Sequence, residues 1–511
     1  MKKLLVKNIG LLATPEGKSA HRGSEQGKIK LLKDAWVLIE DGVIASVGTG
    51  EAPAAEGAEI VDAEGKLVTP GLVDAHTHLI FGGWRQNELG MKLHGKTYLE
   101  IQNAGGGIQS TTNATRGATE EELTAKAAKA LDEMMAFGTT TCEAKSGYGL
   151  ATEHELKALR VIRDLDEQHP MDMVATFMGA HLVPAEYKAN RAEYIRLVCE
   201  EMMPLVKEQG IARFCDVFCE ADTFTVEESR QVLEAGLKYG LRPKIHADEI
   251  EAIGGSQLAS ELGAISAEHL IVCPPAGIEA MAKGGVIACL LPATSFNLGA
   301  VFAPARDMVN AGVPVAMATD FNPGSCPCLN MQFVINLGCL KYRLTPEEVL
   351  TAVTLNGAAA IDMADKVGTV EAGSLDLGEQ RVQLLRVAHG ELEQRVEHAD
   401  HMVVADDCGT LLAEDTERSV LLRLERHGDK ARDVAVQPRA VDVDAVAADH
   451  AAFLHAADAL GDGGRRQPHL VADVAQGAAA VRLQDIEDLI IGSIHGFLSF
   501  FLFALTSRGR A

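Results

Sequence analysis

The chain has 511 residues, a formal net charge of −25 at pH 7, and 47% hydrophobic residues. A chain of this length and composition can form one large barrel with a satellite, or roughly two or three average domains. The excess negative charge argues against nucleic acid and anionic membranes as partners, because both would repel such a surface.

The cysteines and the N-terminus favour a cytoplasmic protein. The ten cysteines show no repeated Cys-x-x-Cys pairing, which is typical of reduced thiols in a cytosolic chain. Only three apolar residues separate Lys3 from Lys7, and this run is too short for the hydrophobic region of a signal peptide.

Residues 1–66 alternate apolar and polar positions, as in Ala35–Ile39 and Val43–Val47. Asp41-Gly42 lies between these two runs, and Asp-Gly in such a setting is a strong hairpin signal. We therefore predict that this segment is the N-terminal part of a small β-sandwich domain without a catalytic cluster.

From Leu67 the pattern changes to short apolar runs that alternate with helical periods, which is typical of repeated βα units and a parallel sheet. We predict that residues 67–365 form a closed (β/α)8 barrel of the TIM type. Its eight strands would comprise one that starts at Leu67 and ends at His78, followed by Thr139–Ala144, Met173–Ala180, Arg213–Cys219, Arg242–Ala247, Ala264–His269, Val286–Leu291 and Val313–Thr319.

Three helices of this region have recognisable first turns, because a Thr is followed three residues later by a Glu, the pattern of a capping box. The third also carries Pro at its first helical position, where proline is favoured. The three pairs are Thr119 with Glu122, Thr225 with Glu228, and Thr345 with Glu348.

Ionisable residues recur where the predicted strands end, and the catalytic groups of such barrels lie at that rim. Any one of them could be an ordinary loop residue, but seven of the eight strands deliver one. They are His76 and His78, Lys145, His181, Glu220, His246 with Glu249, His269, and Asp320.

A metal site is the first hypothesis for this rim. His76 and His78 are separated by one residue, so on an extended strand both project to the same side. A lone His-x-His is more often part of a core, but His246 and Asp320 add a third imidazole and a carboxylate. This donor set suits catalytic zinc.

Two further residues are candidates for the chemistry. Glu249 follows His246 by three residues and could act as the general base toward a metal-activated water, or it could be a solvated loop residue. His269 could hold that water or stabilise the intermediate, or it could only support a ligand.

Several motifs together resemble the amidohydrolase superfamily and, within it, the imidazolonepropionase family, over about residues 1–373. The first motif is common to the superfamily, whereas the second and the last are far more particular. They are Pro70-Gly71-Leu72-Val73-Asp74-Ala75-His76-Thr77-His78, Glu143-Ala144-Lys145-Ser146-Gly147-Tyr148-Gly149, His246-Ala247-Asp248-Glu249 and Thr319-Asp320-Phe321-Asn322-Pro323-Gly324-Ser325.

The resemblance implies a hydrolase of histidine degradation that opens 4-imidazolone-5-propanoate to N-formimidoyl-L-glutamate. It places one Zn²⁺ or Fe³⁺ on His76, His78, His246 and Asp320, and it suggests a homodimer. In an acidic chain, the propionate needs a fixed guanidinium such as Arg85, although alone this residue would pass for a surface arginine. The substrate contacts that it implies are Arg85, Tyr148, His181, Glu249, Asn322, Gly324 and Ser325.

Alternatives remain open. A guanine or cytosine deaminase would share the metal set but need no carboxylate clamp, and a catalytically silent scaffold would need no metal. Lys145 could suggest a carbamylated lysine bridging two metals, but it ends the second strand, whereas that lysine belongs to a later one. We therefore predict one metal. Cys326-Pro327-Cys328 could suggest a thiolate site but reads better as two reduced loop thiols.

We predict that residues 366–511 are an atypical C-terminal segment, a frameshifted or disordered tail in place of the expected return to the β domain, and that the departure from the family pattern begins after Gly373. After Gly373 the family should return to the β domain, but the composition shifts to Ala, Val, Asp, Leu, Arg and His, with one lysine, Lys430. We hypothesise that a frameshift or a misassigned gene end produced this tail. The apolar run Leu489–Leu505 has 17 residues, the lower limit for a membrane span, and favours aggregation rather than an anchor.

Overall fold

The structure is a computed structural model that describes residues 3–96, 100–101, 104–374, 423–426 and 434–437. The chain divides into two compact units, Met1–His398 and Ala399–Ala511. In the second unit, the described residues form an antiparallel pair of strands, β14 (Arg423–Arg426) and β15 (Val434–Gln437). All the predicted site residues lie in the first unit.

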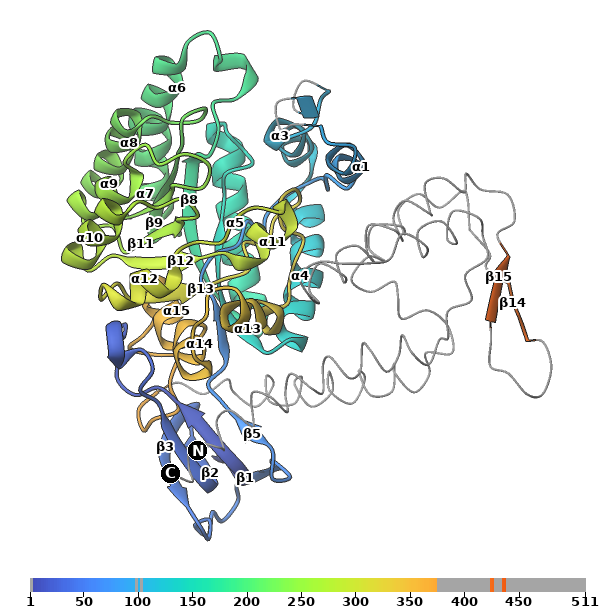
Figure 1. Ribbon diagram of the computed structural model, residues 1–511, viewed down its shortest axis with the longest axis vertical. Helices are drawn as coiled ribbons and strands as arrows, with labels where there is room; N and C mark the ends of the chain where they lie inside the picture. The colour runs from blue at the N-terminus through green and yellow to red at the C-terminus, as the bar shows by residue number, and fades with distance from the viewer. Residues whose placement is uncertain (1–2, 97–99, 102–103, 375–422, 427–433, 438–511) are drawn as a thin grey trace, which may run out of the picture. The chain divides into compact units, whose positions relative to one another are not determined.

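The N-terminal residues form a small five-stranded sheet, at the bottom of Figure 1. Its strands are β1 (Lys3–Thr14), β2 (Lys30–Glu40), β3 (Val43–Thr49), β4 (Glu59–Asp62) and β5 (Leu67–Val68). The order is β3-β2-β1-β4, and β5 pairs with β1. Glu40 pairs with Val43 across Asp41-Gly42, so the predicted hairpin is confirmed. The described residues contribute one sheet of the predicted small β domain.

The chain returns to this sheet after the barrel. The backbone N–H of Gly373 donates to the carbonyl of Ile44 at 2.8 Å, and the N–H of Ile44 donates to the carbonyl of Ser374 at 2.9 Å. The N–H of Val370 donates to Oγ1 of Thr14 at 2.8 Å. These contacts attach the end of the described segment to β3 and β1. The tail hypothesis and the apolar run Leu489–Leu505 concern residues outside the described part of the chain.

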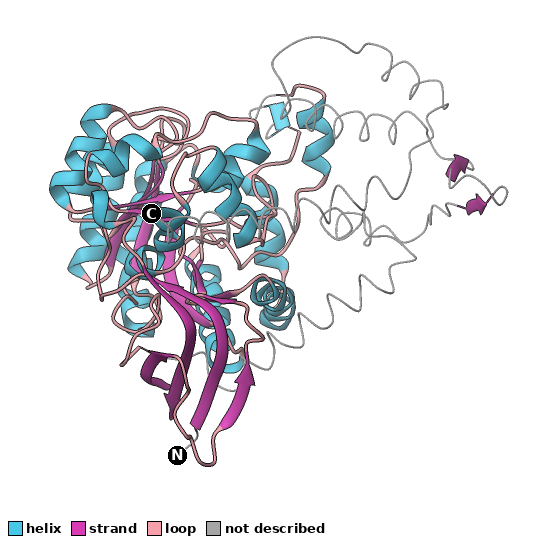
Figure 2. Ribbon diagram, turned by 60° about the horizontal axis from the view of Figure 1, so that its bottom comes forward, coloured by secondary structure: helices cyan, strands magenta, loops and turns pink. Residues whose placement is uncertain are grey.

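Eight parallel strands form the second sheet, in the sequential order β6 to β13. Figure 2 shows strands in magenta inside and helices in cyan around them. The order and the parallel pairing confirm the eight predicted strands and the βα pattern. The strands are β6 (Leu72–Asp74), β7 (Thr139–Lys145), β8 (Asp172–Ala180), β9 (Phe214–Cys219), β10 (Arg242–Ala247), β11 (Ser266–His269), β12 (Ile287–Leu290) and β13 (Val315–Met317).

The first and last strands of this sheet meet just beyond their carboxyl ends. The N–H of Asp320 donates to the carbonyl of His76 at 3.1 Å, and the N–H of His78 donates to the carbonyl of Phe321 at 2.8 Å. Thr77 and Phe321 also form an isolated parallel bridge. The residues that close the barrel are therefore the same residues that carry predicted ligands.

Helices between successive strands cover the outside of the barrel, and an apolar layer fills the space between helices and strands. All three predicted capping boxes are present, at Thr119, Thr225 and Thr345. The helices of this unit are α1 (Asn87–Leu93), α3 (Ile108–Gly117), α4 (Glu120–Ala136), α5 (Thr152–Gln168), α6 (Arg191–Leu197), α7 (Met203–Gln209), α8 (Val226–Lys238), α9 (Gly255–Glu261), α10 (Pro275–Gly284), α11 (Pro292–Leu298), α12 (Ala305–Asn310), α13 (Met331–Leu340), α14 (Pro346–Ala352) and α15 (Leu355–Ala360).

The amino-terminal end of the barrel is filled by apolar side chains from α15. Leu355 and Ala358 pack against Val73 of β6, Phe214 of β9 and neighbouring residues of β12 and β13. This apolar cluster closes the barrel interior at its amino-terminal end. Polar groups inside the barrel are therefore confined to its middle and to its carboxyl-terminal mouth.

The predicted bounds of the first barrel strand are wrong. Leu67–Val68 pair with β1 of the small sheet, and β6 begins only at Leu72 and ends at Asp74. Pro70, which has no N–H to donate, separates the two segments. His76 and His78 therefore lie just past the strand rather than on it. Among the described residues, no helix is long and apolar enough to cross a membrane.

Candidate active site and metal centre

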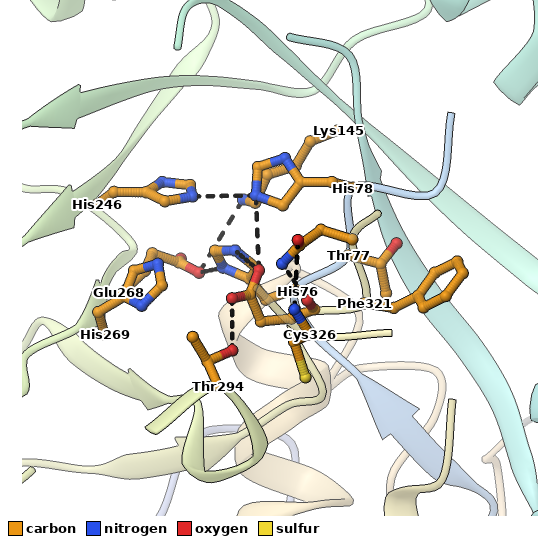
Figure 3. A network of polar contacts seen from close by, with 12 residues as sticks. His76, Thr77, His78, Lys145, His246, Glu268, His269, Thr294, Phe321 and Cys326 are labelled. Atoms are coloured by element: carbon orange, nitrogen blue, oxygen red, sulfur yellow. Dashed lines mark hydrogen bonds and ion pairs between the residues drawn. The ribbon is translucent and has the colours of Figure 1, made fainter. Parts of the chain in front are cut away.

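The four predicted metal ligands converge at the carboxyl-terminal mouth of the barrel. Nε2 of His78 lies 3.3 Å from Nε2 of His246. Oδ1 of Asp320 lies 3.4 Å from Nε2 of His76 and 3.7 Å from Nε2 of His78. Figure 3 shows the three imidazoles turned toward one another. The structure thus brings together residues from the ends of β6, β10 and β13.

These separations fit a metal ion. Ligand atoms about 2.0–2.1 Å from a tetrahedral ion are about 3.3–3.4 Å from one another. Nε2 of His76 is buried and makes no hydrogen bond, although a buried ring nitrogen without a partner is costly. Ligand atoms of His76, His78 and His246, and separately of His76, His269 and Asp320, lie within 4.8 Å of one another.

Two of the three histidines are held by carboxylates. Nδ1 of His76 contacts Oε2 of Glu268, and Nδ1 of His246 lies 3.1 Å from Oδ1 of Asp216. A carboxylate on Nδ1 fixes the tautomer in which Nε2 carries the lone pair. Two of the three rings thus have Nε2 prepared for a cation before one arrives.

Burial also keeps the rings of His76 and His78 neutral. It lowers the pKa of His76 well below its usual value, assisted by the charges of Lys145 and His246. Burial lowers the pKa of His78 in the same way, with His181 as the next cause. A neutral imidazole is the form that binds metals.

Asp320 is fixed by its surroundings. Oδ2 accepts a hydrogen bond from Oγ1 of Thr294 at 2.6 Å, which leaves Oδ1 directed toward the histidines. Burial raises the pKa of Asp320 to about 6, and a nearby cation would favour its carboxylate form. The residue has a positive φ of 57°, a conformation that aspartate tolerates better than most residues do.

Glu249 and His269 lie beside this centre. Nε2 of His269 is 3.6 Å from Oε2 of Glu249. Burial raises the pKa of Glu249 to about 8, and the charges of Asp320 and Glu220 act in the same direction. The Glu249 side chain is 14% exposed, and a largely buried carboxyl with a pKa near the working pH is suited to accept and return a proton. Glu249 is therefore not a solvated loop residue.

The ends of β7 and β8 supply aromatic neighbours. The ring of His181 stacks on that of His78 with centroids 4.8 Å apart, and the Tyr148 ring lies 5.2 Å from that of His181. Nδ1 of His181 is 3.0 Å from the carbonyl of Gly147. Burial lowers the pKa of His181 to about 3, so the ring is neutral and Nε2 can accept a hydrogen bond.

Arg85 is buried, only 7% exposed, and is not the surface arginine that its sequence context alone would suggest. Its Nε and Nη1 make no hydrogen bond, and Oε1 of Glu88 is 3.7 Å from Nε. A Cβ added to Gly324 would lie 1.3 Å from Nη2 of Arg85. Gly324 thus leaves the space that the guanidinium occupies, and the group keeps donors available for an anion.

Asn322 organises its own loop. Oδ1 accepts the N–H groups of Gly324 at 2.9 Å and Ser325 at 2.7 Å, and Nδ2 donates to the carbonyl of Asp320 at 2.8 Å. Nδ2 also donates to Oγ of Ser325 at 2.8 Å. Asn322 therefore shapes the turn that joins Asp320 to Gly324.

Sequence reasoning missed a buried charge network below the ligands. Its members are charged residues within apolar strands, and this was the available signal, because a buried charge needs a partner. Lys145 was predicted to lie at the rim and was considered as a possible carbamate, but not as a member of a charge network. The residues overlooked are Glu143, Asp216, Lys244 and Glu268, all with 0% exposure.

Nζ of Lys145 lies 2.8 Å from Oε2 of Glu143 and 2.7 Å from Oδ2 of Asp216. Burial alone would raise the pKa of Asp216, but the charges of His246 and Lys145 bring it below its usual range. Burial alone would lower the pKa of Lys145, but Asp216 and Glu143 raise it. Both groups are therefore charged, and Lys145 is enclosed by carboxylates.

Two comparisons bear on the family. Residues 67–375 match the model of the amidohydrolase family. The imidazolonepropionase of Alkaliphilus metalliredigens is 52% identical over 379 residues, which cover 73% of this chain and 90% of that protein. The imidazolonepropionase of Brevibacillus brevis is 52% identical over 380 residues, again 73% of this chain and 90% of that protein.

Solved structures share the fold. A guanine deaminase from C. acetobutylicum superposes with a TM-score of 0.57 at 16% identity and covers 76% of this chain and 96% of its own. A triazine hydrolase described as from Arthobacter aurescens gives a TM-score of 0.57 at 17% identity and covers 73% of this chain and 86% of its own. At such low identity the likeness concerns the fold alone.

Proposed function

Because this chain belongs to the amidohydrolase family and, within it, to the imidazolonepropionases, we propose how its own residues open the substrate ring. The enzyme is a hydrolase of histidine degradation that converts 4-imidazolone-5-propanoate and water to N-formimidoyl-L-glutamate. The observation that carries the assignment is the 52% identity to relatives of that name over nearly their whole length.

Enzymes of this family depend on a metal. We assign one zinc or iron ion to Nε2 of His76, Nε2 of His78, Nε2 of His246 and Oδ1 of Asp320, because these four atoms converge at distances that suit a single ion. When bound, such an ion supplies a Lewis acid that polarises a carbonyl and makes water a nucleophile near neutral pH.

Glu249 is the proposed general base. It takes a proton from the water as the water oxygen bonds to the ring carbonyl carbon, and it returns the proton to the ring nitrogen as the carbon–nitrogen bond breaks. The support is its largely buried position 3.6 Å from His269 and its pKa of about 8. His269 is assigned to the stabilisation of the addition intermediate.

Arg85 is the proposed clamp for the propionate carboxylate, since its buried guanidinium keeps Nε and Nη1 without hydrogen-bond partners. Tyr148 and neutral His181 contact the ring of His78 and are assigned to the substrate ring or to the carboxylate. Asn322, Gly324 and Ser325 are assigned to the pocket wall. The contacts of two of these residues support that role. Asn322 accepts the N–H of Gly324 and so fixes the loop, and Gly324 has no side chain that would overlap the guanidinium of Arg85.

The experiment is a direct assay of imidazolone propionate consumption by purified protein, with the metal content measured on the same sample. The expected result is turnover with about one zinc or iron per chain. Arg85→Ala should raise KM about 100-fold or more and leave the metal content unchanged, because the carboxylate contact is lost while the four metal ligands stay in place. A deaminase would retain its activity in this variant, and a scaffold would contain no metal.

We further propose a cytoplasmic homodimer, from the resemblance and from the reduced state of the thiols. The described cysteines are all free, and most are buried. Sedimentation of the purified protein measures the assembly state directly. A monomer at assay concentrations that retains full activity would remove the dimer from this account.

A further inference from the structure

Two lysines and three carboxylates occupy the interior of the barrel below the metal centre, and the proposed reaction uses none of them. They come from four different strands, β7, β9, β10 and β11, and all are fully buried. Five ionisable groups in such a place cost considerable desolvation energy, so they persist only with well-made contacts. The members are Glu143, Lys145, Asp216, Lys244 and Glu268.

Lys145 is the centre of this network. Its Nζ is 2.7 Å from Oδ2 of Asp216 and 4.0 Å from Oε2 of Glu268. The other oxygen of Asp216 is 3.1 Å from Nδ1 of His246, and Oε2 of Glu268 contacts Nδ1 of His76. One ammonium group therefore bonds Asp216 directly and lies within ion-pair distance of Glu268, whose other oxygen is 3.3 Å from Nζ of Lys244. Lys145 lies behind His78 in the view of Figure 3.

We propose that Lys145 is a positioning residue of the metal centre, which acts through Asp216 and Glu268 to hold His246 and His76 with their Nε2 atoms toward the ion. This inference rests on the metal site assigned above. Without this ammonium, three buried carboxylates would share the single positive charge of Lys244, and their repulsion would turn Asp216 and Glu268 away from the histidines. The enclosed amine is a cation and does not bridge two metals as a carbamate.

The charges in the barrel agree with this assignment. Lys145 and Lys244 neutralise two of the three carboxylates, which leaves one negative charge in the network. Asp320 adds a second negative charge at the mouth. These two charges match a divalent cation, so the network with its ion is close to neutral, as a low-dielectric interior requires. Removal of Lys145 would break this balance.

The test is the rate at which the zinc-loaded, full-length enzyme releases zinc to a chelator. Lys145→Met should accelerate release about 10-fold to 100-fold, the range found when an outer carboxylate partner is lost. Lys157→Met is the matched control, because Lys157 is also buried but bonds only the carbonyls of Thr115, Arg116 and Ala118. This control should leave the release rate within about twofold of the parent.

A second variant separates positioning from loss of structure. Asp216→Asn should also accelerate zinc release, and Lys145→Met should add less in the Asp216→Asn background than it does in the parent, because the route through Asp216 is already broken and only the route through Glu268 remains. If Lys145→Met yields no folded protein, Asp216→Asn decides alone. Unchanged release from Asp216→Asn would overturn the proposal.

Two other outcomes are equally decisive. If Lys145→Met and Lys157→Met accelerate release to the same extent, the effect is general destabilisation and the inference is wrong. If the effects of Lys145→Met and Asp216→Asn simply add, the two residues act independently and the inference is again wrong. A parent enzyme that binds no zinc would instead contradict the proposed metal site, so the two failures are distinguishable.

Discussion

Glu249, the proposed general base, is harder to ionise in the folded protein than in the unfolded chain. In the metal-free protein its pKa is about 8, because burial and the nearby charges of Asp320 and Glu220 oppose its ionisation. An exposed glutamate ionises near 4.3. The folded protein therefore holds this proton over a pH range in which the unfolded chain has already released it.

This difference predicts a pH dependence of stability. The favourable contribution of neutral Glu249 is present below about pH 4 and is lost as the pH rises toward about 8, because the unfolded state then binds fewer protons than the folded state. Metal-free Glu249→Gln should lose less stability between pH 5 and pH 8 than the metal-free parent, by about 2–4 kcal/mol. Urea unfolding at several pH values measures the difference.

The same variant tests the role in catalysis. With metal bound, Glu249→Gln should reduce kcat by a factor of about 10² to 10⁴, because the amide cannot take the proton. The metal content should be unchanged. Parallel stability curves for parent and variant, or nearly full activity of the variant, would show that Glu249 is not the buried base.

Some site residues were predictable from the sequence and others were not, for a physical reason. His76, His78, His246 and Asp320 stood out because barrel chemistry is located at strand ends. The network around Lys145 did not, because charged residues inside strands suggest a solvent-facing side, whereas in a closed barrel they face one another. Only the packing shows which of these two arrangements holds.

At the scale of elements, the end of β9 controls the loop after β10. Oε2 of Glu220 accepts the N–H of Ile250 at 2.9 Å, and Oε1 accepts the N–H groups of Glu251 at 3.0 Å and Ala221 at 3.1 Å. Ile250 and Glu251 are the two residues that follow Glu249. The carboxylate of Glu220, 2% exposed, thus fixes the loop that presents the proposed base.

Glu220→Gln should therefore lower kcat about 10-fold to 100-fold with a smaller change in KM, because an amide offers only one acceptor atom and the loop that carries Glu249 would shift. Metal content should stay constant. Asp222→Asn is the matched control, since Asp222 is an exposed carboxylate two residues away. Equal kinetics for Glu220→Gln and the parent would show that Glu249 does not depend on this contact.

Elements were predicted best where local chemistry fixes them. The capping boxes at Thr119, Thr225 and Thr345 are present because a side chain and a backbone three residues apart satisfy each other whatever the fold. The first barrel strand was predicted wrongly, because Leu67–Val68 are apolar enough for either sheet. Their pairing with Leu11 and Leu12 of β1 is a long-range choice that no local pattern contains.

At the scale of the whole molecule, the site depends on the closure of the barrel. His76 and Asp320, at opposite ends of the eight-stranded sheet, meet through the backbone contact that joins the first strand to the last. The apolar cluster around α15 packs against these strands at the amino-terminal end of the barrel. Every residue assigned a role lies between positions 76 and 325, within the segment that the family model matches.

This placement predicts that a chain truncated after Ser374 retains the activity and the metal content of the full chain within about twofold, because the described contacts that fix the site lie within residues 3–374. Turnover and metal content of the two purified proteins provide the comparison. Loss of metal on truncation would assign the tail a role in the site. The frameshift hypothesis stays a prediction, and an intact reading frame with peptides from the tail would defeat it.

The central claim is that one ion joins Nε2 of three histidines and Oδ1 of Asp320. The direct measurement is a crystal structure of the active, metal-loaded enzyme with anomalous diffraction at the metal edge. We predict a single peak about 2.0–2.2 Å from His76, His78, His246 and Asp320. A peak held by other residues, or an active enzyme without a metal peak at this mouth of the barrel, would contradict the account.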